Sequence, residues 1–127
     1  MQNKQHNIDF LELVEECRPF VKEISIHELK QKLDRQESFT LIDVREAYEW
    51  NQGYIRHAKH MARGTIDRDV GNNITDKESE IVLYCSGGFR SILAAFNLQK
   101  MGYKNVKSMS GGLKYWLDVG YEITLDE

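Results

Sequence analysis

The 127-residue chain is predicted to fold as a single α/β domain, in which a small central parallel sheet carries helices on both faces. Short apolar, partly β-branched runs alternate along the sequence with segments of helical periodicity, an arrangement typical of a covered parallel sheet. The composition, with 41% hydrophobic and 29% charged residues, 9 glycines and 1 proline, is that of a globular protein. A chain of this length can bury a core without metals or crosslinks.

The chain is divided into a helical extension, residues 1–21, and a main domain, residues 22–127. In the extension, Pro19 is expected to end a helix whose apolar side chains recur at three- and four-residue spacing. These side chains are Phe10, Leu13, Val14 and Cys17. The acidic side of the helix fits a docking face for a partner and a solvated surface equally well, and Cys17 is interpreted as a packing residue.

The first half of the main domain opens with a helix, because Ser25 and Glu28 form a capping-box pattern. A buried strand is predicted over residues 40–44, followed by a helical turn at 46–51 that ends at Gly53. The remaining elements of this half are a strand near 59–62, a small helix after Gly64 and a surface loop over 71–80.

The second half contains the clearest unit, a buried strand at 80–84, a loop at 85–90 and a helix over 91–101. The helix is apolar around most of its circumference, so we expect it to be central. The chain is completed by a strand at 106–109, a Gly111-Gly112 turn and a helix at 113–119 stopped by Gly120.

Charge and hydropathy exclude several functional classes. The chain has 17 basic and 20 acidic residues, a net charge of −3, and the basic residues are scattered, so neither nucleic acid nor an anionic membrane is an expected partner. No apolar run approaches the roughly 20 residues needed to cross a bilayer, and the polar start shows no secretory signal. A cytoplasmic location is expected, in which Cys17 and Cys85 are free thiols outside any Cys-x-x-Cys motif.

Cys85 is the candidate nucleophile because it follows a buried strand, at the edge where parallel sheets bind ligands. Gly87 and Gly88 allow the next residues to curl so that their N–H groups face inward, and the following helix adds its positive end. Such donors favour a thiolate without a histidine base. We therefore expect these amides to point at the sulfur and the thiol to be open to solvent.

A Cys-His protease is the alternative that a histidine base would support. The histidines are His6, His27, His57 and His60, all well away from the loop in sequence. His57 or His60 would have to fold back onto Cys85 with a third group to orient it, and the sequence disfavours this.

Three separated stretches of the main domain carry recognisable motifs. They are residues 41–46 with Glu49-Trp50 and 53–55, the loop at 84–91, and Gly111-Gly112 with Trp116 and Gly120-Tyr121. In this order and spacing, the stretches resemble single-domain rhodaneses, sulfurtransferases of the thiosulfate sulfurtransferase type, over residues 22–123. Tyr54 replaces the family's usual His, while Arg56-His57 and Leu113 also depart from the common pattern; these changes affect packing and turns.

The resemblance implies a rhodanese-like fold and a catalytic Cys85 that takes a sulfane sulfur from thiosulfate or a persulfide. A thiol, which could belong to a protein, or cyanide would then accept the sulfur, without a metal or another cofactor. The residues expected to bind substrate are Ser86, Gly87, Gly88, Phe89, Arg90 and Arg63, and those expected to support the site are Asp43, Arg45 and Ser91. Arg45 is expected to pair with Glu49, and Asp43 to bond amides near the active-site loop.

Two alternatives stay open. A phosphatase or arsenate reductase could use the same thiolate, but these relatives carry one residue more between the cysteine and the arginine than the four that separate Cys85 from Arg90 here. The other alternative is a noncatalytic module that carries sulfur or only binds a partner.

Overall fold

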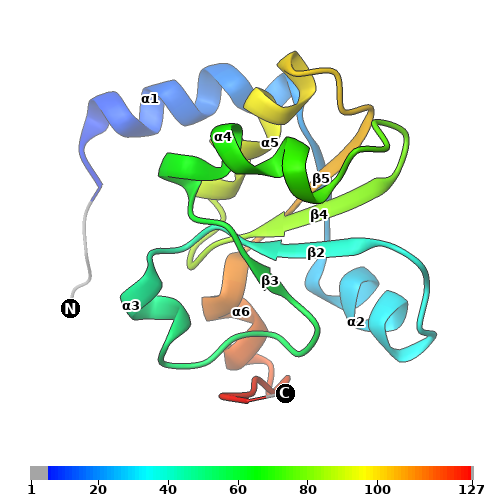
Figure 1. Ribbon diagram of the computed structural model, residues 1–127. Coiled ribbons are helices and arrows are strands. Elements are labelled where there is room, and N and C mark those ends of the chain that lie inside the picture. Colours follow the sequence, from blue (N-terminus) through cyan, green and yellow to red (C-terminus); the bar gives the residue numbers. More distant parts are fainter. Residues whose placement is uncertain (1–5, 127) are drawn as a thin grey trace.

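A five-stranded parallel sheet lies at the centre of the computed structural model, which describes residues 6–126 (Figure 1). The strand order is β1-β5-β4-β2-β3. The strands are β1 (Lys22–Ile24), β2 (Thr40–Asp43), β3 (Lys59–His60), β4 (Glu80–Tyr84) and β5 (Asn105–Met109). Because β4 is the middle strand, the residue that follows it lies at the centre of the sheet's carboxyl edge.

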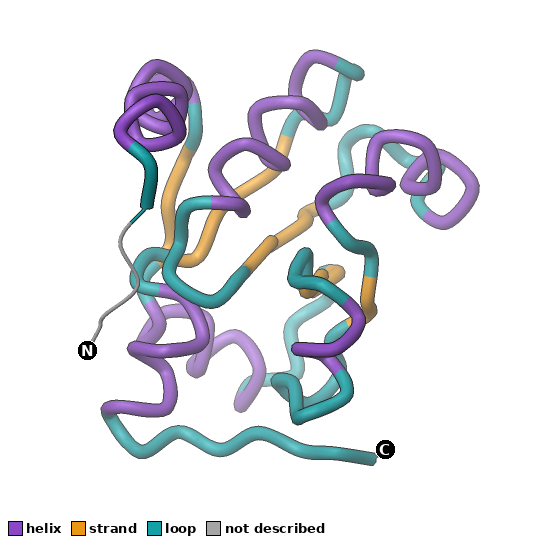
Figure 2. Tube along the Cα trace, turned by 90° about the vertical axis from the view of Figure 1, so that its left-hand side faces the viewer, coloured by secondary structure: helices purple, strands orange, loops and turns teal. Residues whose placement is uncertain are grey.

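Helices cover both faces of the sheet, which confirms the predicted α/β class (Figures 1 and 2). One face carries α1 (Ile8–Cys17), α4 (Arg63–Asn73) and α5 (Arg90–Lys100), and the other α2 (Ile26–Asp34), α3 (Ala47–Trp50) and α6 (Gly112–Asp118). A short 3-10 turn, Arg18–Phe20, joins α1 to β1.

The sheet separates two apolar clusters, and β4 contributes to both. Ile81 and Leu83 face the side of α5, whereas Val82 and Tyr84 face the opposite side with Trp116 of α6. A strand that is buried on both faces has no polar alternation, which is why residues 80–84 read as a continuous apolar run.

The predicted capping box is confirmed at the start of α2. The Glu28 amide donates to the Ser25 hydroxyl over 3.0 Å, and the Ser25 amide donates to the Glu28 carboxylate over 2.9 Å. This reciprocal pair satisfies two amides that the first helical turn leaves without partners.

Two elements differ from the sequence-based prediction. The sequence did not predict β1, because Lys22 and Glu23 are exposed and only Ile24 is buried, so three residues give no strand pattern. The surface loop does not begin at residue 71, because α4 continues to Asn73. Ile66 and Val70 of that helix are fully buried, and this packing outweighs the weak helix propensity of its last residues.

Helix α1 packs on the same core as α5, through the buried side chains of Val14 and Cys17. Leu13 is wrongly predicted as part of this apolar stripe, since it is 47% exposed. The division of the chain at residues 21 and 22 stays a prediction. Among residues 6–126, no helix has the length and apolar character needed to span a bilayer.

Candidate active site

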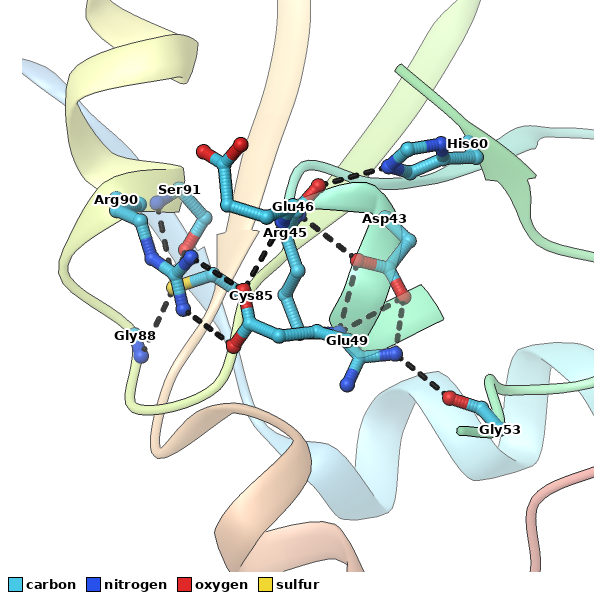
Figure 3. Close-up of polar contacts among 10 residues, drawn as sticks. All are labelled: Asp43, Arg45, Glu46, Glu49, Gly53, His60, Cys85, Gly88, Arg90 and Ser91. Carbon is cyan, nitrogen blue, oxygen red and sulfur yellow. Dashed lines mark hydrogen bonds and ion pairs between the residues drawn. The ribbon is translucent and has the colours of Figure 1, made fainter. Parts of the chain in front are cut away.

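Cys85 directly follows β4, at the carboxyl edge of the sheet, as the sequence predicts. The strand register places the end of β2 beside it, because Asp43 pairs with Tyr84. The loop after Cys85 leads into α5, which begins at Arg90. Cys85, the loop and the start of α5 therefore form one compact unit at the centre of this edge (Figure 3).

Two amides and one hydroxyl contact the Cys85 sulfur (Figure 3). The amides of Gly88 and Ser91 donate to Sγ over 3.2 and 3.4 Å, and the Ser91 hydroxyl oxygen lies 3.5 Å from it. Hydrogen bonds to a charged acceptor are roughly twice as strong as neutral ones, so this arrangement stabilises an anionic sulfur. The expectation that loop amides point inward is confirmed for Gly88, and Ser91 contacts the sulfur directly instead of only supporting the site.

The loop needs one of its two glycines for its conformation. Gly88 has φ +93°, and a Cβ atom added there would lie 3.2 Å from the Gly111 amide nitrogen. A Cβ atom at Gly87 would make only ordinary contacts, 3.6 Å from the Phe89 ring. Gly88 therefore sets both the turn and the close approach of the two glycine-containing segments.

The Gly111-Gly112 turn and the start of α6 hold the backbone of the active-site loop. The amides of Leu113 and Lys114, at the start of α6, donate to the carbonyl oxygens of Cys85 and Ser86 over 2.8 and 2.9 Å. Gly112 has φ +65°, and an added Cβ would collide with the Ser86 carbonyl group, whose carbon it would approach to 2.6 Å. Only a glycine lets α6 come close enough for these two hydrogen bonds.

Arg90 is bound by an acidic partner on α3. Its guanidinium donates to both Glu49 oxygens, over 2.7 and 3.1 Å, and the two side chains are 25% and 18% exposed. The Arg90 hydrogen bond holds the pKa of Glu49 below its ordinary value, and the same bond, with the charge of Cys85 contributing, raises the pKa of Arg90. A role of Arg90 in binding an anionic donor stays a prediction, and Glu49 offsets part of the charge on which that role depends.

Asp43 and Arg45 form a buried ion pair with each other, so the predicted partners of both are wrong. The Arg45 guanidinium donates to both Asp43 oxygens, at 2.8 Å for the shortest contact, and also to the Gly53 carbonyl oxygen over 2.7 Å. The Asp43 carboxylate accepts a hydrogen bond from the Arg45 amide and not from amides near the active-site loop. Glu49 pairs with Arg90 and not with Arg45. An interaction between residues two apart at a strand end lies outside the helical spacing on which the prediction relied.

The other predicted binding residues surround this unit less closely. The Ser86 carbonyl is held by α6, whereas the Phe89 ring packs against the core and touches the imidazole of His6, with ring centroids 5.0 Å apart. Arg63 starts α4, and its amide donates to the Val44 carbonyl over 3.0 Å. Among residues 6–126 the Arg63 guanidinium has no ion-pair partner, and its role in binding stays a prediction.

The thiol is closed to solvent, and the expectation of an open thiol is wrong. Cys85 is 1% exposed. The loop that supplies the donors wraps around the sulfur, and Phe89 and Arg90 are themselves partly buried beside it. Cys85 therefore offers almost no surface to a sulfur donor in this structure.

Sequence reasoning missed three contributors to the site, namely Glu49 as the partner of Arg90, Ser108 behind Ser91, and the α6 amides beneath the loop. Ser108 left a readable signal, because it lies two residues after buried Val106 in a strand and so shares the face that packs on α5. The α6 amides left no signal in side-chain chemistry, since they act through the backbone.

The fold and the site define a class of α/β proteins in which a buried cysteine lies directly after the central strand of a parallel sheet, in a loop that leads into a helix. Within this class, the chain matches the family model described as a rhodanese-like domain over residues 25–118. The chain belongs to the rhodanese-like family, which confirms the family that the sequence motifs indicate.

Relatives and solved structures agree with this assignment. Two Bacillus subtilis (strain 168) proteins are similar over 96 residues, or 76% of this chain. YtwF, whose name describes a sulfurtransferase, is 38% identical, and the match covers 90% of its length. YrkF, whose name describes a sulfur carrier, is 33% identical, and the match covers 51% of its length, so this chain spans about half of that protein. RPA3614 of Rhodopseudomonas palustris, described as a possible tyrosine phosphatase, has a TM-score of 0.81 at 22% identity, over 98% of this chain and all of that one, and supports the fold alone.

Proposed function

We propose that this protein is a sulfurtransferase that carries a sulfane sulfur as a persulfide on Cys85. In the first step the Cys85 thiolate attacks the outer sulfur of thiosulfate, the bond between the two donor sulfurs breaks, and sulfite leaves with the bonding electron pair. A low-molecular-weight persulfide would react in the same way and leave as a thiolate. Cys85 then bears a terminal sulfur that carries the negative charge.

In the second step an acceptor attacks that terminal sulfur. Cyanide would leave as thiocyanate and a thiolate as a new persulfide, and in both cases the electron pair of the broken sulfur–sulfur bond returns to the Cys85 sulfur. The acceptor thiol could belong to a small molecule or a protein. We place this chemistry in the cytoplasm, where acceptor thiols remain reduced.

The observation that carries the proposal is the set of donors on Cys85 Sγ, namely the Gly88 amide, the Ser91 amide and the Ser91 hydroxyl. The same sulfur is the nucleophile of the first step and the leaving group of the second. Fixed donors that stabilise its negative charge therefore increase the fraction of thiolate available for the first step and lower the barrier of the second, in which the charge returns to this sulfur, and no metal or organic cofactor is required in the scheme.

The length of the loop supports sulfur as the transferred group. Four residues, Ser86 to Phe89, separate Cys85 from Arg90, and the loop closes around one sulfur atom with Gly88 at 3.2 Å. A tetrahedral oxyanion would require a wider ring of donors. Turnover of a chromogenic phosphate ester at a rate comparable to sulfur transfer would overturn the proposal.

A sulfur carrier is the second candidate, and the similarity to YrkF favours it. A carrier would form the same Cys85 persulfide but release the sulfur only to a dedicated partner. The two candidates differ in the second step, so slow turnover with cyanide or small thiols after rapid loading would identify the carrier.

The deciding experiment is intact mass spectrometry after incubation of the protein with thiosulfate and, separately, with glutathione persulfide. We expect the mass of one added sulfur atom, lost on treatment with a thiol reductant, and peptide mapping should place it on Cys85. The buried Cys17 is the internal control and should remain unmodified. An adduct confined to Cys17, or no adduct with either donor, would contradict the proposal.

A further inference from the structure

A pair of buried hydroxyls lies behind the Cys85 sulfur. Ser108, in β5, and Ser91, in the first turn of α5, are both fully buried. Their hydroxyl oxygens are 2.8 Å apart, and the Ser91 oxygen is in turn 3.5 Å from Cys85 Sγ. The sulfur, Ser91 and Ser108 therefore form a continuous chain of polar contacts that leads from the loop into the core.

The charge on the sulfur decides the direction of this chain. A thiolate can only accept hydrogen bonds, so the Ser91 hydroxyl must donate to it and must accept the proton of the Ser108 hydroxyl. In that direction both hydroxyl protons are used. In the opposite direction Ser91 would donate to Ser108, and the Ser108 proton would have no partner among the described residues, which is unfavourable in a buried site.

We propose that Ser108 is a positioning residue, which holds the Ser91 hydroxyl in the orientation that donates to the Cys85 thiolate. Without Ser108, the Ser91 hydroxyl would lose the partner that fixes its orientation, and it could rotate away from the sulfur. Ser108 does not touch the sulfur, so it acts only through Ser91. The inference concerns the resting thiolate and rests on the proposed function only for its role in transfer.

The test is the pH profile of Cys85 alkylation by iodoacetamide, because the rate follows the thiolate fraction. All variants carry Cys17→Ser, so that Cys85 is the only thiol, and the products are followed by intact mass. We expect Ser91→Ala to move the profile midpoint upward by about 1 pH unit and Ser108→Ala by about 0.5 unit, since a lost hydrogen bond to a charged group disfavours the charged form.

The double variant decides between action through Ser91 and an independent effect. Ser108→Ala should add no further shift in the Ser91→Ala background, because residues that act as one unit are not additive. Arg90 and Glu49, the charged pair next to this site, are unchanged in every variant. A Ser108→Ala shift that persists without the Ser91 hydroxyl, or no shift at all, would overturn the inference.

Ser110→Ala is the matched control, because Ser110 follows the same strand but donates to the surface residue Glu23 over 3.0 Å. It should leave the alkylation profile unchanged. The outcome is independent of sulfur transfer, so a Ser108 shift in a protein that forms no persulfide would refute the proposed function and leave the positioning role intact.

Discussion

The two cysteines of this protein are buried in the same apolar cluster, yet their sulfurs have opposite surroundings. Cys17, the last residue of α1, is 7% exposed, and within residues 6–126 its sulfur receives no hydrogen bond. Cys85 is 1% exposed, and its sulfur receives two amides and lies within reach of a hydroxyl. Both side chains are removed from water, so burial does not distinguish them.

The difference supports the proposal that only one of the two cysteines is a nucleophile. Burial in an apolar environment disfavours the charged form, and burial, followed by the charge of Glu16, raises the pKa of Cys17. At Cys85, by contrast, two backbone amides donate to the sulfur. Reactivity here is thus expected to follow the backbone geometry of one loop, and the experiments below test that contrast from the largest expected effect to the smallest.

Replacement of each cysteine by serine tests the contrast most directly. Cys85→Ser should lower sulfur transfer from thiosulfate to cyanide by at least about 1,000-fold, because the nucleophile of both steps is lost. Cys17→Ser should leave the rate within about twofold of the wild type. Steady-state thiocyanate formation measures both, and equal losses in the two variants would mean that the cysteines are not functionally distinct.

The hydrogen bonds from α6 to the active-site loop can be disrupted at Gly112 without a change to any side chain of the site. Gly112→Ala should lower transfer by about 100-fold, because the added Cβ would collide with the Ser86 carbonyl and displace the donors on Cys85. Gly120→Ala is the matched control: its φ of +91° also disfavours alanine, but nothing lies within 4 Å of the added Cβ.

Thermal unfolding of the two glycine variants separates loop geometry from general backbone strain. Both should be destabilised by about 1 kcal/mol or more from the left-handed conformation alone. Only Gly112→Ala should also lose transfer activity in the protein that remains folded. Equal activity losses would assign the effect to stability.

The sequence was sufficient to predict the strand, loop and helix around Cys85 because their signals are local. A buried strand, a cysteine, paired glycines and an apolar helix follow one another within residues 80–101, and each determines its own backbone conformation. The same reasoning distinguishes Cys85 from Cys17, since only Cys85 follows a strand, and the reactive role of Cys85 stays a prediction.

The contacts that complete the site join residues far apart in the sequence, so local patterns could not predict them. The pairing of Glu49 with Arg90 spans 41 positions and depends on how α3 packs beside the loop, so the sequence suggested the nearer Arg45 instead. The burial of Cys85, which is 1% exposed, likewise depends on how the elements pack in the assembled fold. Local patterns predict elements and turns, whereas partners between elements follow from the assembled fold.

The Arg90–Glu49 pair permits a finer test of how the site distinguishes sulfur donors of different charge. Glu49→Gln retains a hydrogen-bonding side chain but releases the charge of Arg90. We expect the ratio of kcat/KM for thiosulfate, a dianion, to that for an organic thiosulfonate, a monoanion that loads the same persulfide and leaves as a sulfinate, to rise about threefold, and this rise should shrink with added salt. Glu46→Gln, one turn away on the exposed side, removes the same formal charge and should change the ratio far less.

The smallest expected effect is the pH dependence of stability that this ion pair causes. Arg90 lowers the pKa of Glu49 in the folded protein, so the pair stabilises the fold above the unfolded-state value of about 4.3, and this contribution is lost as the pH falls through the folded-state value. Because both side chains are partly exposed and screened, we expect Glu49→Gln to cost about 0.5 to 1 kcal/mol at pH 7. Urea unfolding of the two proteins should give free energies that converge below about pH 4. A difference that stays constant to low pH would show that the loss comes from packing and not from the charge of Glu49.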